Sequence, residues 1–186
     1  MKSSSHIIST ILRIPAVLIS VFLLFSCGGG DDDDLVIWDF VNVNVMIQVQ
    51  DASGKNLLSP SVAGNLQGKK IYLDYDGEEY ELNWDAEEAS RFNMPFFRGL
   101  TIRAPHYYSD GEHYVADHSK NYLSFGEFDG SKNQNVTVIL HIDGYSESWE
   151  VTVNHTVKWE NKKPVVTNAA TLNGKDTPYD GIVITL

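Results

Sequence analysis

The chain contains a single cysteine, Cys27, among its 186 residues. One thiol allows no internal disulfide, and no cysteine pair is present to form a thiolate zinc site. Cys27 lies beside glycines and aspartates and not within an alternating apolar stretch, which argues against a buried core cysteine. An odd thiol of this kind needs an explanation outside the hydrophobic core.

The short motifs that carry catalysis or nucleotide binding are also missing. The sequence contains no Gly-x-Ser-x-Gly, no His-Glu-x-x-His and no phosphate-cradling glycine loop. Basic residues are few, because 14 Lys and Arg stand against 25 Asp and Glu, giving a formal net charge of −11. A field of that sign repels phosphate, so we expect no nucleic-acid partner. We expect no cofactor either.

The N-terminal segment 1–26 has the three regions of a secretory signal peptide. Lys2 and Arg13 flank a polar start, residues 14–25 form an apolar run, and the small residue Ser26 follows that run. A helix of this run covers about 18 Å, short of the hydrocarbon core of about 30 Å, so a permanent span is the weaker interpretation. An uncleaved anchor helix over residues 7–25 is the alternative.

The end of this segment, Leu24-Phe25-Ser26-Cys27, resembles the bacterial lipobox. In that motif a peptidase cuts before the cysteine, and the thiol carries a diacylglycerol. The resemblance implies lipidation of Cys27 and attachment to a membrane through that lipid.

Three glycines and four aspartates follow, and we expect residues 27–35 to form a flexible spacer. A lipidated cysteine followed by a short acidic run is similar to the surface-export signal of Bacteroidetes lipoproteins. The resemblance implies an outer-membrane protein that is exposed at the cell surface.

Alternation with period two dominates the rest of the chain, residues 36–186, which we expect to form one domain. Valine and isoleucine alternate with mostly polar residues over 41–49, which is typical of a strand with one buried face. Residues 136–142 and 149–159 predict a longer hairpin, with His155 on its apolar face as a hydrogen-bonded core histidine or, alternatively, a metal ligand.

A further hairpin is predicted around Asp76-Gly77, a pair that favours a two-residue turn. The register places Leu73 opposite Tyr80 on the inner face and Asp74 opposite Glu79 on the outer face. The same alternation places Trp84 inward.

These segments together predict an all-β fold. About nine strands, Asp-Gly turns and one short helical turn over 86–91 favour an antiparallel β-sandwich of immunoglobulin-like arrangement. A more closed β-barrel is the alternative.

Two segments of the predicted domain carry a second resemblance. Phe40–Pro60, which ends in Val-Gln-Asp-Ala-Ser-Gly-Lys-Asn-Leu-Leu-Ser-Pro, and Tyr122–Gly130 look like parts of small Bacteroidetes lipoproteins of uncharacterised function. This implies a surface β-sandwich and carries over no catalytic residue.

Candidate site residues gather in one stretch of the chain. Imidazoles and carboxylates there would suit Zn²⁺, but their spacing is not diagnostic, so we expect no metal and keep four weak candidates: His106, Asp110, His113 and His118. Aromatic residues outside the core alternation are the candidate ligand-binding residues: Tyr107, Tyr108 and Tyr122.

The residues favour a non-enzymatic binding or accessory module that takes a glycan or an envelope protein. A carboxylate-dependent hydrolase is the first alternative, with only four residues to carry it: Asp74, Glu79, Glu87 and Glu88. A structural subunit that assembles by strand addition through residues 181–186 is the second.

Overall fold

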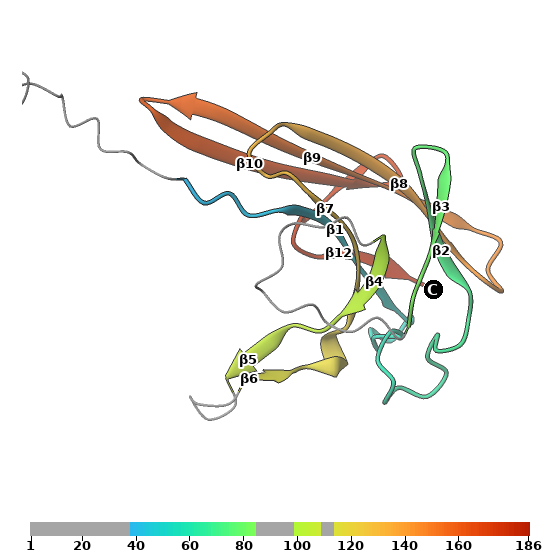
Figure 1. Ribbon diagram of the computed structural model, residues 1–186. Helices are drawn as coiled ribbons and strands as arrows, with labels where there is room; N and C mark the ends of the chain where they lie inside the picture. Colours follow the sequence, from blue (N-terminus) through green and yellow to red (C-terminus); the bar gives the residue numbers. More distant parts are fainter. Residues whose placement is uncertain (1–37, 85–98, 109–113) are drawn as a thin grey trace, which may run out of the picture. The chain divides into compact units, whose positions relative to one another are not determined.

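The computed structural model describes residues 38–84, 99–108 and 114–186. The predicted signal peptide, the spacer with Cys27 and the predicted helical turn over 86–91 lie outside these residues. Phe40–Leu186 forms one compact unit, whose strands are traced in Figure 1.

The described residues contain twelve strands and one short 3-10 helix. The strands are β1 (Val43–Gln50), β2 (Ile71–Tyr75), β3 (Glu78–Glu81), β4 (Leu100–Arg103), β5 (His106–Tyr108), β6 (Tyr114–Ala116), β7 (Tyr122–Phe128), β8 (Gln134–Ile142), β9 (Ser148–Glu160), β10 (Lys163–Leu172), β11 (Lys175–Thr177) and β12 (Ile182–Thr185). The 3-10 helix is η1 (His118–Lys120).

The strands form two main sheets and one separate hairpin. The four-stranded sheet has the order β12-β1-β7-β4, the six-stranded sheet has the order β11-β10-β9-β8-β2-β3, and β5 pairs with β6. Among the described strands every pair is antiparallel except β1 with β12. The predicted β-sandwich is confirmed, and the barrel alternative is wrong, because neither sheet closes on itself.

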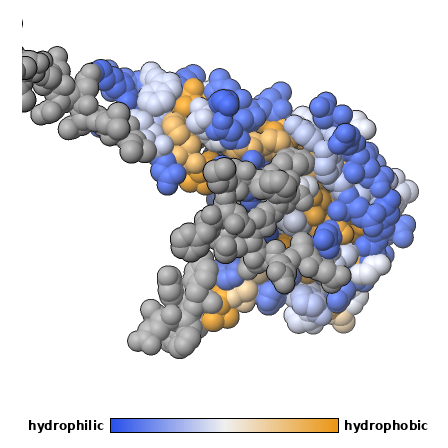
Figure 2. All heavy atoms as spheres, viewed as in Figure 1, coloured by the Kyte–Doolittle hydropathy of each residue, from blue (hydrophilic) through white to orange (hydrophobic). Residues whose placement is uncertain are grey.

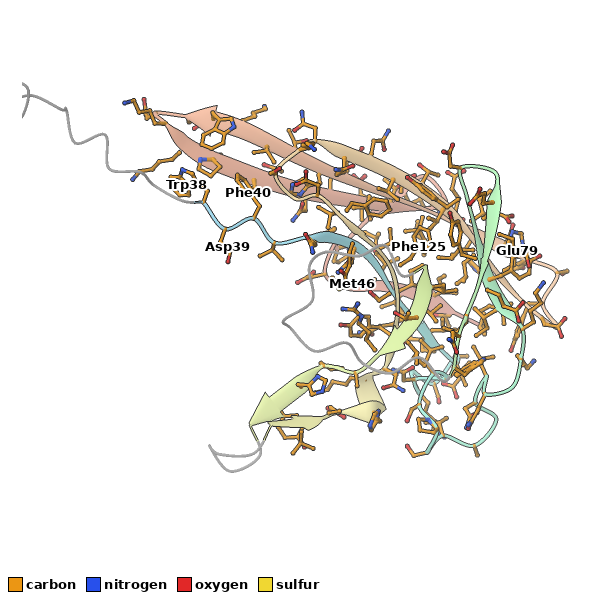
Figure 3. The ribbon with its side chains drawn as sticks, viewed as in Figure 1. Trp38, Asp39, Phe40, Met46, Glu79 and Phe125 are labelled. Carbon is orange, nitrogen blue, oxygen red and sulfur yellow. The ribbon has the colours of Figure 1, made fainter. Side chains whose placement is uncertain are left out.

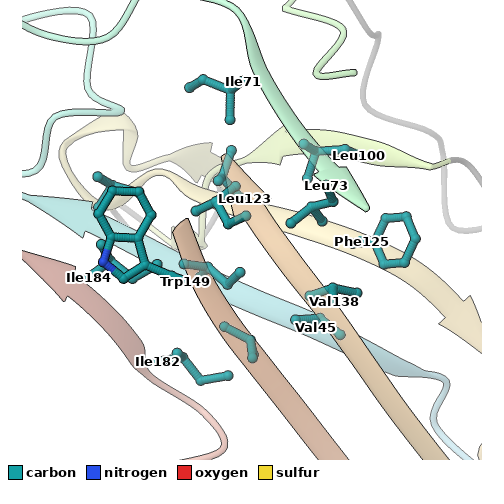
Figure 4. Packing of buried hydrophobic residues seen from close by; sticks show 14 of the residues in the cluster. Val45, Ile71, Leu73, Leu100, Leu123, Phe125, Val138, Trp149, Ile182 and Ile184 are labelled. Carbon is teal, nitrogen blue, oxygen red and sulfur yellow. The ribbon is translucent and has the colours of Figure 1, made fainter. Parts of the chain in front are cut away.

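Both main sheets contribute to one hydrophobic core (Figure 4). Alternate residues of β1 are buried, and each of the remaining positions of this strand is half-buried. The six-stranded sheet contributes β2, β8 and β9 in the same alternating way. Since successive side chains of a strand point to opposite faces, period two in the sequence becomes one buried face per strand. The described surface is mainly hydrophilic in the view of Figure 2.

The hairpin of β2 and β3 has the predicted register. Leu73 pairs with Tyr80 and Asp74 pairs with Glu79. Asp76 and Gly77 both have positive φ, at 51° and 82°, as a primed two-residue turn requires. The opposed carboxylates each bind a side chain that can carry positive charge. His141 Nε2 lies 3.0 Å from Asp74, and Lys70 Nζ lies 2.6 Å from Glu79.

The apolar face of β9 is shorter than the sequence predicts. Trp149 and Val153 are buried, and His155 is a buried, hydrogen-bonded histidine as predicted. Val157 is only half-buried, and Trp159 is 56% exposed. The expectation fails here because β9 is thirteen residues long and continues beyond the core cluster, whose last β9 member toward the turn is Val153.

Two further expectations need correction. Val41 lies before β1 and is exposed, so the first strand is shorter than the alternating run. Trp84 follows β3 and is half-buried against the core, where its Nε1–H donates to the carbonyl oxygen of Lys69 at 3.4 Å. Its inward direction is as predicted, but its burial is incomplete.

Candidate functional site

Two hollows adjoin on the compact unit, because Pro105 and Lys120 line both of them. The first, of about 200 Å³, is lined by Met46, Gln48, Pro105, Lys120, Tyr122, Asp180 and Gly181. The second, of about 260 Å³, is lined by Pro105, His106, Tyr107, Asp117 and Lys120. Their shared residues make them two halves of one surface site, which we call the Lys120 site.

Strand β1 supplies one wall of this site. Met46 and Gln48 alternate with the buried Ile47, so their side chains point to the face opposite the core. Met46 is labelled on β1 in Figure 3. Gly181 lies directly before β12, which runs parallel to β1 with Ile182 opposite Ile47. The parallel pairing therefore brings the end of the sequence to the wall formed by its first described strand.

Tyr122 is held at the site by the buried residue before it. The side-chain amide of Asn121 donates to the carbonyl oxygen of Leu58 at 3.0 Å, and the Asn121 carbonyl accepts from the amide of Asn56 at 2.7 Å. Tyr122 then pairs with Arg103 as β7 begins beside β4. These bonds fix where β7 begins and so position Tyr122.

The short helix η1 positions Lys120. Asp117 caps the helix, accepting from the backbone N–H of Ser119 at 3.1 Å and also from the Ser119 hydroxyl. The other carboxylate oxygen lies 3.1 Å from Lys120 Nζ. The Asp117 backbone N–H donates to the Pro105 carbonyl oxygen at 2.8 Å. This joins η1 to the base of the β5–β6 hairpin.

Hydrogen bonds hold one carboxylate of the Lys120 site, that of Asp117, in its ionised form. Hydrogen bonds from the side chains of Ser119 and Lys120 lower the pKa of Asp117, and the bond from Ser119 has the larger effect. The carboxylate therefore stays ionised at neutral pH and is a poor general acid. Asp180, an amide at Gln48 and an ammonium at Lys120 complete a set of hydrogen-bonding groups around the aromatic residues.

The predicted ligand-binding tyrosines fall in the two hollows. Tyr107, 52% exposed, lines one half of the site, and the half-buried Tyr122 lines the other. Tyr108 follows Tyr107 as the last residue of β5 and is not among the residues that line either hollow. The structure thus places two of the three tyrosines at one surface, although they are fifteen positions apart in the sequence.

The weak metal candidates are only partly described. His106 lies half-buried in β5 and His118 lies exposed in η1, whereas Asp110 and His113 fall outside the described residues. Within residues 38–84, 99–108 and 114–186, no three His, Cys, Asp or Glu side chains come together as a metal site.

The structure describes two of the four carboxylates that the hydrolase alternative requires. Asp74 and Glu79 lie on the outer face of the β2–β3 hairpin, each bound to its own partner, His141 or Lys70. Glu87 and Glu88 lie outside the described residues.

Sequence reasoning missed Gln48 and Lys120. A signal for Lys120 exists, because Asp51, Asp117 and Asp129 each precede a serine by two residues. All three carboxylates accept from the backbone N–H and the hydroxyl of that serine. An Asp-x-Ser turn thus predicts an ordered loop, and at Asp117 it orients the lysine that follows. Gln48 carries no comparable signal, since every strand has such outward polar residues.

The fold and this site define a β-sandwich with a shallow, aromatic-lined surface site. No protein-family model, no curated protein and no solved structure significantly matches the chain. Among the described residues no helix is long and apolar enough to cross a bilayer.

Proposed function

We propose that this protein is a lipid-anchored, non-enzymatic binding module of the cell envelope that takes a glycan at the Lys120 site. The observation that carries the proposal is the pair of adjoining hollows that share Lys120, one with Tyr107 and one with Tyr122. Aromatic rings offer apolar faces for a sugar ring, and the amide, ammonium and carboxylates around them match its hydroxyls.

Two features support a glycan over other ligands. Each hollow is smaller than the about 300 to 1,000 Å³ of a typical pocket for a drug-sized molecule, so a chain of small units fits better than one large ligand. The net charge of −11 disfavours anionic polymers, so a neutral glycan is expected. Hydrogen bonds from Ser119 and Lys120 keep Asp117 ionised, and an ionised carboxylate is a poor general acid, which supports binding without hydrolysis.

The cellular location rests on the sequence. The lipobox-like Leu24-Phe25-Ser26-Cys27 and the acidic run after it support an outer-membrane lipoprotein exposed at the cell surface. The spacer of residues 28–35 then adds at most about 3.3 Å per residue between the lipid and the domain.

A glycan array probed with the protein from Gly28 onward tests the proposal, followed by titration of the best ligand. Tyr122→Ala and Tyr107→Ala should each weaken binding about tenfold, a loss of about 1.4 kcal/mol, because each removes an aromatic face from the site. Tyr145→Ala is the matched control, because Tyr145 is an exposed tyrosine that lines neither hollow. Binding that survives both site variants, or an array without any ligand, would contradict a glycan site here.

A further inference from the structure

The longest hairpin of the structure carries an open strand edge. β10 pairs with β9 along its whole length, from Lys163 opposite Glu160 to Leu172 opposite Val151. On its other side β11 covers only Ala170–Leu172. Within the part of the chain that the structure describes, no strand lies against the outer edge of Lys163–Ala169.

The turns at both ends of β10 show which backbone groups face this edge. Glu160 and Lys163 are separated by a two-residue turn, and so are Leu172 and Lys175. The pair that closes such a turn exchanges both of its backbone hydrogen bonds. Lys163 therefore directs its backbone groups toward β9, and Leu172 directs its own toward β11.

Because the backbone groups of successive residues point to alternate sides of a strand, the two ends define the direction at every position of β10 between them. Odd-numbered residues of β10 bond to β9, and even-numbered residues point outward. The N–H of Val157 agrees, because it donates to the Asn133 side chain at 2.7 Å and so points away from β10. Its partner Val166 then points away from β9. The open edge presents the N–H groups of Val166 and Asn168 and the carbonyl oxygens of Pro164, Val166 and Asn168.

This edge has little of the usual protection against pairing. Charged side chains and bulges commonly block an exposed edge. The stretch from Pro164 to Leu172 contains no charged residue, and the pairing of β10 with β9 has no register shift. Val165 and Val166 are 41% and 45% exposed. Pro164 removes one outward donor, which leaves the other outward groups available.

We propose that the open edge of β10 pairs antiparallel with the same edge of a second copy of this chain. With Val166 opposite Val166 of the second copy, Lys163 falls opposite the uncharged Ala169, so no like charges oppose each other. Such a contact is isologous and closes at two copies. It joins the two six-stranded sheets into one continuous sheet.

The second copy also extends the apolar face of the hairpin. Val166 shares a face with Val157, and Pro164 shares it with Trp159, which lies edge-to-face with Phe40 at a ring-centroid distance of 6.2 Å. A strand added at the edge places its own Val166 beside these side chains. The self-complementary, uncharged edge therefore favours a second copy over a foreign strand or a lipid surface, both of which remain distinguishable outcomes of the test.

Disulfide trapping tests the contact in cells that express the full chain. The hydrogen-bonded pair at the two-fold axis has a Cα–Cα distance of about 5.5 Å, within the range for a disulfide. Val166→Cys should give a reducible band of twice the chain mass after mild oxidation. Thr171→Cys should not, because β11 already covers that end of β10. The parent chain should also give no such band, and a band there would reveal an unmodified Cys27, contradicting lipidation but not the edge contact.

An edge charge provides the second test, with the mass of the purified full chain in detergent measured by light scattering. Thr167→Lys should convert a dimer into a monomer without lowering the melting temperature, because Thr167 is exposed at the open edge. Asn135→Lys adds the same charge at an exposed position of β8, which is separated from β10 by β9, and should leave the dimer intact. A monomeric parent chain, a dimer that survives Thr167→Lys, or capture of a different protein or lipid by β10 would overturn the second-copy contact.

Discussion

His155 donates a hydrogen bond from Nε2 to the backbone carbonyl oxygen of Gly130, at 2.9 Å. The carbonyl can only accept, so the direction of this bond is defined. Both residues are buried, and the bond ties the middle of β9 to the turn that precedes β8. On its other side the His155 ring lies 2.6 Å from the side-chain oxygen of Asn168 on β10.

His155→Leu should therefore destabilise the fold. It leaves the buried Gly130 carbonyl without a donor, which costs about 1 to 3 kcal/mol, whereas the exposed Asn168 amide can turn to water. Urea denaturation midpoints measure the effect. His155→Gln, which keeps an N–H donor, should lose less, and equal loss in both variants would show that ring packing dominates.

Trp149 and Trp84 should differ in their contribution to stability. Trp149 is 7% exposed, and its truncation to alanine should cost about 3 to 5 kcal/mol. Trp84 is half-buried, so Trp84→Ala should cost about 2 kcal/mol. Denaturant midpoints for the two variants provide the comparison. The reverse order would contradict the burial described for these side chains.

Asp129 should make stability depend on pH under acidic conditions. Hydrogen bonds from the side chain of Ser131, then from Lys132, hold the pKa of Asp129 well below its usual range. A lowered folded-state pKa stabilises the fold at pH values above the unfolded-state pKa of about 3.9, and this contribution is lost as the pH falls through the folded-state value.

The parent chain and Asp129→Asn should therefore differ by a constant amount between pH 7 and about pH 5, and the difference should shrink as the pH falls below about 4. Urea midpoints across this range give the profile. Ser131→Ala removes the hydrogen bond that lowers the pKa of Asp129 the most. The stability of this variant should therefore depend less on pH than that of the parent chain. A difference that stays unchanged at the acidic end would assign the effect to turn geometry rather than charge.

Cys27 should be acylated, and Cys27→Ser should leave an unprocessed precursor of larger mass. A clickable palmitate analogue supplied to the cells reports acylation, and an immunoblot reports processing. Cys27 lies outside the compact unit Phe40–Leu186, so the melting temperature of that unit should be the same in Cys27→Ser and in the parent chain. A parent chain without label would contradict the lipoprotein proposal.

Local pattern predicted much of the fold, because period two and turn chemistry act over a few residues. The register of Leu73 with Tyr80 followed from the Asp76-Gly77 turn alone. β10 was not predicted, since Pro164-Val165-Val166-Thr167 does not alternate and proline argues against a central strand. The structure accommodates proline in β10 because position 164 faces the open edge, where no neighbouring strand requires an N–H donor.

The sequence predicted Tyr107 and Tyr122 as ligand-binding residues and His106 as a weak metal candidate, but it did not predict the polar groups that the Lys120 site places around them. Tyr107 and Tyr122 were recognisable because they lie outside the core alternation. Gln48 and Asp180 reach the site through the pairing of β1 with β12, which joins segments more than a hundred residues apart. No local pattern specifies which distant strands become neighbours, so the groups around the tyrosines required the structure.

The pairing of β1 with β12 also sets the order in which the chain can fold. The side chain of Gln50 donates to the hydroxyl of Thr185 across 135 positions of sequence, at 3.1 Å. Closing so long a loop costs entropy before any contact compensates for it, and proteins rich in such pairings fold in milliseconds to seconds. The four-stranded sheet can therefore be completed only after β12 has been synthesised, so the edge of β1 that pairs with β12 has no partner until then.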